Sequence, residues 1–113
     1  MARSHTGPKS LARSMERRGA SSREHAEETT DQYDTIRERA RASVYERVAQ
    51  DVREAVEQDG DLGSLADTFE RKATSSREHA EETTDQYDQR REYARAQVWD
   101  EAARQLRETI SDE

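Results

Sequence analysis

The sequence predicts an all-α protein in which a unit of one short and one long helix is present twice. Ala, Glu, Lys, Leu and Arg supply 54 of the 113 residues, a composition typical of long helices. Apolar residues recur at steps of three or four, as on one face of a helix. The chain also matches itself at an offset of 54 residues. These observations favour a tandem duplication that forms an antiparallel helical hairpin and assembles into a helical bundle.

A polar block is the best preserved part of the duplication. Residues 21–34 read SSREHAEETTDQYD and recur without change at 75–88. The flanks match at only 5 of the 14 preceding positions and 9 of the 25 following positions. Exposed polar residues usually tolerate substitution, so their retention favours one ligand shared by both copies. A recent duplication or gene conversion is the alternative explanation.

The chain divides into three parts. Residues 1–8, with a Gly-Pro pair, are expected to be a flexible basic arm. Residues 9–60 form helical repeat 1 and residues 61–113 form helical repeat 2. The sequence Asp-Gly-Asp at 59–61 predicts the break between them.

Helix boundaries in repeat 1 follow from its glycine and serines. A short helix is expected over 9–18, ended by Gly19. Ser21 followed by Glu24 has the pattern of a capping box. Because no Gly or Pro follows until the break, one long helix is expected over 22–58. Repeat 2 repeats this design.

An apolar stripe runs along each long helix. Pairing the two long helices as antiparallel neighbours would place the two blocks at opposite ends of the hairpin. Tyr45 and Trp99 occupy the same repeat position, at the flank of the stripe. Aromatic residues are enriched at interfaces, so we expect these two at an oligomer interface. A wider bundle core is the alternative, and both placements require another helix beside the long one. The stripe of repeat 1 comprises Ala26, Thr29, Tyr33, Ile36, Ala40, Val44, Val48, Val52 and Ala55.

Composition narrows the functional classes. Leu, Ile, Val and Phe together number only 12, too few to cover two long helices, so a homo-oligomer, a dimer or larger, is expected. Cysteine is absent, which excludes thiolate metal sites and disulfides. No apolar run approaches 18 residues, so a soluble, cytoplasmic protein without membrane contact is expected. A narrow helical bundle offers little concave space for catalysis, and we expect neither an enzyme nor a cofactor.

The favoured function is that of a non-enzymatic helical binding or assembly protein. It would self-associate and present its two identical polar blocks to a partner. The residues expected to bind the partner are Arg23, Glu24, His25, Glu28, Asp31 and Tyr33 with their second copies Arg77, Glu78, His79, Glu82, Asp85 and Tyr87.

Nucleic-acid binding is the first alternative. Residues 11–26 resemble the first two helices of helix-turn-helix regulators, through Leu11, Ala12, Met15, Gly19, Ser21 and Ala26. That resemblance implies a small nucleic-acid-binding regulator that uses its basic N-terminal segment. Basic side chains near a helix start can contact phosphates, and the residues in question are Arg13, Arg17, Arg18 and Arg23.

Metal binding is the second alternative. His25 and Glu28 are three residues apart, as are His79 and Glu82. Side chains at this spacing share a helix face and can bind one ion. Facing helices in carboxylate-bridged metal bundles supply Glu and His ligands in a related way.

Overall fold

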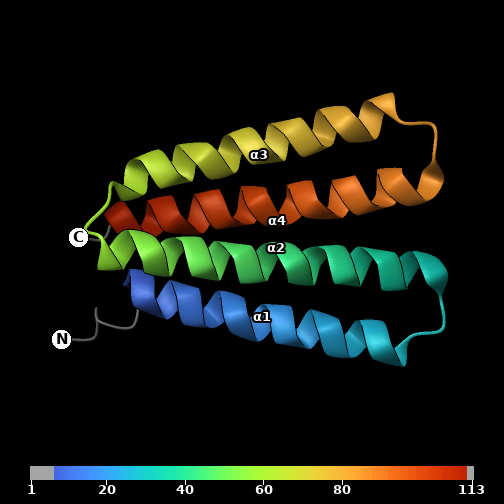
Figure 1. The fold of residues 1–113 in the computed structure, drawn as a ribbon, viewed down its shortest axis with the longest axis horizontal. Coiled ribbons are helices and arrows are strands. Elements are labelled where there is room, and N and C mark those ends of the chain that lie inside the picture. Colours follow the sequence, from blue (N-terminus) through green and yellow to red (C-terminus); the bar gives the residue numbers. More distant parts are fainter. Residues whose placement is uncertain (1–6, 112–113) are drawn as a thin grey trace.

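The structure is a bundle of four helices built from two helical hairpins (Figure 1). The computed structural model describes residues 7–111. Helix α1 (Pro8–Glu28) packs against α2 (Gln32–Glu57), and α3 (Leu62–Glu82) packs against α4 (Gln86–Ser111). The described part of the chain contains no strand. The predicted all-α fold and the bundle of helical hairpins are confirmed.

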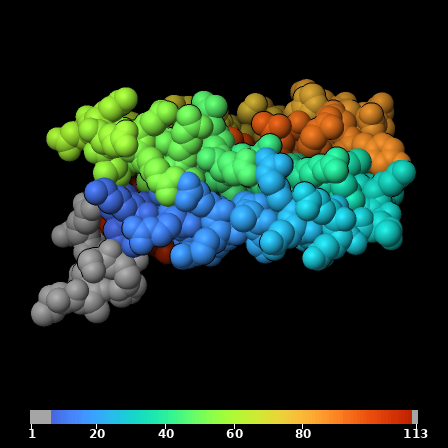
Figure 2. Space-filling model, turned by 60° about the horizontal axis from the view of Figure 1, so that its bottom comes forward, coloured from blue at the N-terminus to red at the C-terminus, as the bar shows by residue number. Residues whose placement is uncertain are grey.

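The two hairpins meet along α2 and α4, which run side by side in the same direction (Figure 1). Both hairpin turns therefore lie at one end of the bundle, and the α2–α3 connection lies at the other. Figure 2 shows α1 lying along α2, with the turns of both hairpins at the same end of the molecule. The prediction that the two blocks lie at opposite ends is wrong, because each repeat folds back on itself within its own block.

The predicted helix boundaries are wrong at Gly19 and Ser21, both of which lie inside α1. A helical glycine costs only about 1 kcal/mol relative to alanine. Gly19 also lets α2 approach closely, because a Cβ there would lie 3.3 Å from the Tyr45 Cβ. The capping-box interpretation of Ser21 fails because this serine is an exposed residue in the middle of a helix. The chain reverses ten residues later, with Asp31 as the N-cap of α2.

The second break lies where the sequence predicts it. Helix α2 ends at Glu57, and Asp61 caps α3 by accepting hydrogen bonds from the backbone N–H groups of Gly63 and Ser64. Between them, Asp59 has a φ of 56° and Gly60 N–H bonds to the carbonyl of Ala55 at 2.7 Å.

The core contains the central part of the predicted stripe. All four helices contribute small and medium apolar side chains, which lets the helix backbones pack closely. Repeat 2 supplies the bulkier residues, and Phe69 packs on Trp99 with ring centroids 5.4 Å apart. The largest fully buried side chains are Phe69, Met15, Leu106, Val44, Val48, Val52 and Val98.

Tyr45 and Trp99 lie inside this core and not at an exposed flank. They are 3% and 4% exposed in a single chain, so the prediction that they form an oligomer interface is wrong. The other helix that these aromatic residues require is supplied by the same chain. Self-association stays a prediction. The reason given for it weakens, because the helices of a single chain cover one another around one shared core.

Ion pairs between helices explain several matches in the flanks of the block. Arg53 on α2 binds Glu16 on α1, and the equivalent Arg107 on α4 binds Glu70 on α3. Each pair holds the two helices of one hairpin together. Exposed pairs of this kind contribute little stability individually, but they fix the register of the helices.

None of the described helices is long and apolar enough to cross a membrane. Of the predicted N-terminal arm, residues 1–6 lie outside the described part of the chain, whereas Pro8 is the first residue of α1.

Candidate functional site

The two copies of the block contact each other and form one surface at the end of the bundle. We call this surface the tip and define it as residues 21–34 and 75–88. The rings of Tyr33 and Tyr87 are stacked, with centroids 5.0 Å apart. Tyr33 donates a hydrogen bond to Gln86 Oε1, and Tyr87 donates one to Gln32 Oε1, both at 2.8 Å. The tip thus has approximate twofold symmetry.

Each block also makes a tight turn between two helices. Asp31 accepts hydrogen bonds from the backbone N–H groups of Tyr33 at 2.9 Å and Asp34 at 3.3 Å. Thr29 Oγ1 accepts one from the Asp31 N–H at 3.3 Å. Asp85 and Thr83 repeat these bonds in the second copy. These contacts satisfy N–H groups that a helix start leaves free, so part of the sequence identity is structural.

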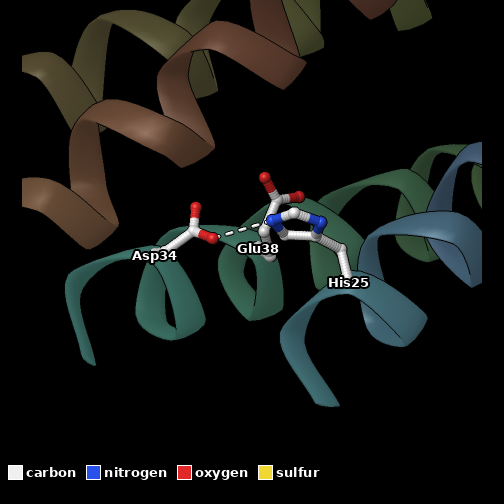
Figure 3. A group of neighbouring side chains, drawn as sticks. All are labelled: His25, Asp34 and Glu38. Atoms are coloured by element: carbon white, nitrogen blue, oxygen red, sulfur yellow. Dashed lines mark hydrogen bonds and ion pairs between the residues drawn. The ribbon is translucent and has the colours of Figure 1, made fainter. Parts of the chain in front are cut away.

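The turn brings together a histidine from one helix and two carboxylates from the next. His25 lies in the last turn of α1, and Asp34 and Glu38 lie one turn apart on α2 (Figure 3). His25 Nε2 is 2.7 Å from Asp34 Oδ2. One nitrogen or oxygen atom from each of the three side chains lies within 4.8 Å of the others. The second copy has the same group in His79, Asp88 and Glu92.

The electrostatic environment keeps these aspartates ionised. The hydrogen bond from His25 holds the pKa of Asp34 below its usual value of about 3.8, and Arg37 adds to this effect. In the second copy His79, followed by Arg91, lowers the pKa of Asp88 in the same way. Both carboxylates are therefore available as acceptors or ligands throughout the neutral range.

Arg23 anchors the base of the tip. Its guanidinium binds both carboxylate oxygens of Glu46 at 2.6 and 2.7 Å. This hydrogen bonding raises the pKa of Arg23. Arg77 makes the equivalent pair with Asp100. Among the residues predicted to bind a partner, these two arginines hold helices together within the chain.

Other identical residues of the tip have no comparable internal role. The side chains of Glu24, Glu28 and Thr30 are exposed and make no hydrogen bond or ion pair within residues 7–111, and the same holds for their second copies. Each block carries five carboxylates and one arginine, so the tip is strongly acidic. Protein stability does not explain why these exposed residues match.

A shallow apolar hollow of about 360 Å³ lies on one side of the tip. Tyr87, which is 40% exposed, forms part of its wall together with Ile36. The opposite side differs, because Arg90 occupies the repeat position of Ile36 and lies over the Tyr33 ring at 4.2 Å from its centroid. The remaining residues around the hollow are Thr30, Gln32 and Thr35.

The arginines expected to bind nucleic acid are only partly free. Arg18 binds Glu101 on α4, and Arg23 binds Glu46 on α2. Arg13 and Arg17 are exposed on α1. Since α1 continues through Gly19 and Ser21, the chain makes no turn at these residues, and the resemblance to helix-turn-helix regulators is not supported by the fold.

The sequence pairs each histidine with Glu28 or Glu82 as candidate metal ligands, whereas the structure places other carboxylates beside the histidines. Glu28 and Glu82 are exposed and do not belong to the histidine groups, which instead contain residues of the following helix. Asp34 and Glu38 were missed because their approach to His25 depends on the turn at residues 29–31. Two features of the sequence could have indicated this cluster: Asp31, which has the chemistry of a helix cap, and the match between Glu38 and Glu92.

Comparison of the chain with protein-family models, with curated proteins and with solved structures gave no match. The function must therefore be argued from the geometry of the tip.

Proposed function

We propose that this chain is a non-enzymatic binding protein and that its tip recognises a basic protein partner. The observation that carries the proposal is the identity of exposed residues with no internal role, such as Glu28 and its copy Glu82. They belong to the same blocks as contacts that do need both copies, including the stack of Tyr33 and Tyr87. A recent duplication of the whole unit would also make the flanks identical, whereas the flanks have diverged, so gene conversion confined to the block is the alternative that stays open.

The chemistry of the tip favours a partner with exposed Lys or Arg side chains. Acidic side chains in excess attract such a partner and speed its association. The exposed ring of Tyr87 and the side chain of Ile36 offer apolar contact beside these charges. Aromatic residues next to charged groups are frequent at energetically important positions of interfaces. The same acidic charge repels nucleic acid, which makes that alternative less favourable.

Site-specific photocrosslinking in the cell of origin tests this proposal. A photoreactive phenylalanine analogue is placed at Glu28 or Glu82 in the tip. The matched controls are Glu54 and Glu108, which are also exposed acidic residues at equivalent repeat positions but lie toward the opposite ends of α2 and α4. We expect a discrete adduct from both tip positions, with the crosslink mapped to a basic segment of the partner. Equal adducts from tip and control positions would contradict the proposal.

A further inference from the structure

We propose that each hairpin turn is also a binding site for one divalent transition-metal ion of the Zn²⁺ type. The ligands would be His25, Asp34 and Glu38 in the first copy and His79, Asp88 and Glu92 in the second. This inference does not depend on the proposed partner, since the residues that it uses differ from the exposed glutamates considered above.

The donor atoms are close to the arrangement that such an ion needs. Zinc bonds of about 2.0–2.2 Å place neighbouring ligand atoms about 3.3 Å apart. His25 Nε2 and Asp34 Oδ2 are 2.7 Å apart, and all three donor groups lie within 4.8 Å of one another. Small side-chain rotations therefore suffice to admit an ion, which takes the place of the hydrogen bond between His25 Nε2 and Asp34 Oδ2.

The neighbouring arginines occupy positions that leave the ligand atoms free. Arg37 binds Asp34 through Oδ1, whereas His25 contacts Oδ2. Arg41 Nε lies 3.8 Å from Glu38 Oε1, which leaves the other carboxylate oxygen of Glu38 available. Groups that hydrogen-bond to metal-binding carboxylates orient them and are typical of metal sites. Arg91 and Arg95 take the same positions in the second copy.

The pattern of identity beyond the block follows this site. After the block ends, Arg37, Glu38 and Arg41 are all identical to their second copies. Residues 35, 36 and 39 differ between the repeats, and Ile36 is replaced by Arg90, whereas the buried Ala40 is also identical to its copy. Among the residues of 35–41 that are not buried, the match is thus retained only at the two arginines and the glutamate of the cluster.

The donor set and its exposure favour a particular class of ion. Imidazole suits zinc and similar transition metals, whereas Ca²⁺ and Mg²⁺ prefer sites made of oxygen atoms alone. The His25 side chain is 54% exposed, so water can complete the coordination sphere. Three protein ligands with an open position are characteristic of sites that exchange water or another ligand.

Metal titration of the untagged chain tests the proposal. Co²⁺ serves as the probe, because its visible absorption reports its ligands, and His5→Ala is the parent variant because the chain has a third histidine at position 5. We expect two equivalents of Co²⁺ per chain, which Zn²⁺ displaces and excess Ca²⁺ does not. His25→Ala should retain one equivalent, and His25→Ala/His79→Ala should retain none.

The control variant is Glu28→Gln/Glu82→Gln, which changes exposed acidic residues of the same block and should still bind two equivalents. Zn²⁺ should also raise the thermal unfolding midpoint of the parent and not that of the double histidine variant, since a ligand stabilises only the state that binds it. Fewer than two equivalents in the parent, displacement by Ca²⁺, or full binding without both histidines would overturn the proposal. If the double variant does not fold, the parent and single-site variants still decide the question.

Discussion

Tyr33 and Tyr87 stack across the line where the two hairpins meet, with ring planes 24° apart, and each donates a hydrogen bond to the glutamine that precedes the other. The contact joins residues from two different helices, α2 and α4. A change in either copy therefore affects both. This reciprocity gives a structural reason for the identity of Gln32 and Tyr33 with Gln86 and Tyr87.

The stack should be energetically coupled. Tyr33→Ala and Tyr87→Ala should each lower the free energy of unfolding by about 1–2 kcal/mol, because each removes the stack and a hydrogen bond. The double variant should lose less than the sum, since the two side chains share one contact. Urea unfolding of the four chains of this double-mutant cycle measures the coupling. Strict additivity would mean that the rings contribute independently.

Substitutions of the aspartates at the turns should destabilise the chain more than substitution of Ser21, which has only the sequence pattern of a cap. Asp31→Ala and Asp85→Ala should each cost about 1 kcal/mol of stability, because each aspartate accepts two backbone hydrogen bonds at a helix start. Ser21→Ala is the control and should change stability by less than about 0.5 kcal/mol, as expected for an exposed position in the middle of a helix. Equal costs in thermal unfolding would restore the capping-box interpretation.

The core aromatic residues should matter for stability. Trp99→Ala should cost about 3–5 kcal/mol, because it leaves a cavity beside Phe69. Tyr93→Ala on the same helix is a suitable control, since Tyr93 is 41% exposed, and its effect should stay within about 0.5 kcal/mol. Unfolding in guanidinium chloride measures the free energy of unfolding of both variants. A Trp99→Ala variant as stable as the parent would show that this side chain is not in the core.

Lowering the pH should destabilise the folded chain through the aspartates of the hairpin turns. The pKa values of Asp34 and Asp88 are lower in the folded chain than the ordinary value of about 3.8, chiefly because of His25 and His79. A carboxyl with a depressed folded pKa contributes stability that is present above the unfolded pKa and is lost as the pH falls through the folded pKa. We therefore expect the free energy of unfolding to fall below about pH 4.

Replacement of both carboxyls tests this origin of the pH dependence. In Asp34→Asn/Asp88→Asn, the loss of stability between pH 5 and pH 2 should be smaller than in the parent. Urea unfolding across this range provides the measurement. An unchanged acid dependence would assign the effect to other carboxylates whose pKa values are also lowered, such as Glu16 and Asp61.

The sequence was sufficient to predict the all-α fold and much of the core, but not the helix boundaries. The spacing of Val44, Val48 and Val52 predicts one buried face, and the structure buries all three. Local signals could not locate the turn, because Gly19 with Ser21 and Thr29 with Asp31 both have the chemistry of a helix boundary. Packing between the helices favours a turn at Thr29 to Asp31, because a turn there buries Ala12, Met15 and their neighbours against α2 and α4.

The candidate metal site could not be predicted for the same reason. On one continuous helix, His25 and Asp34 would lie about 13.5 Å apart along the axis and on opposite faces. The reversal at residues 29–31 brings them into contact at 2.7 Å. A cluster that depends on a turn becomes visible only when the turn is placed correctly.

The central claim is that the two blocks act together as one binding surface. Nuclear magnetic resonance titration of the labelled chain with the partner identified by crosslinking tests it most directly. We expect the amide signals of residues 21–34 and 75–88 to shift together, while those near the α2–α3 connection stay unchanged. Shifts confined to one block, or centred on residues 57–62 at the opposite end, would contradict the claim.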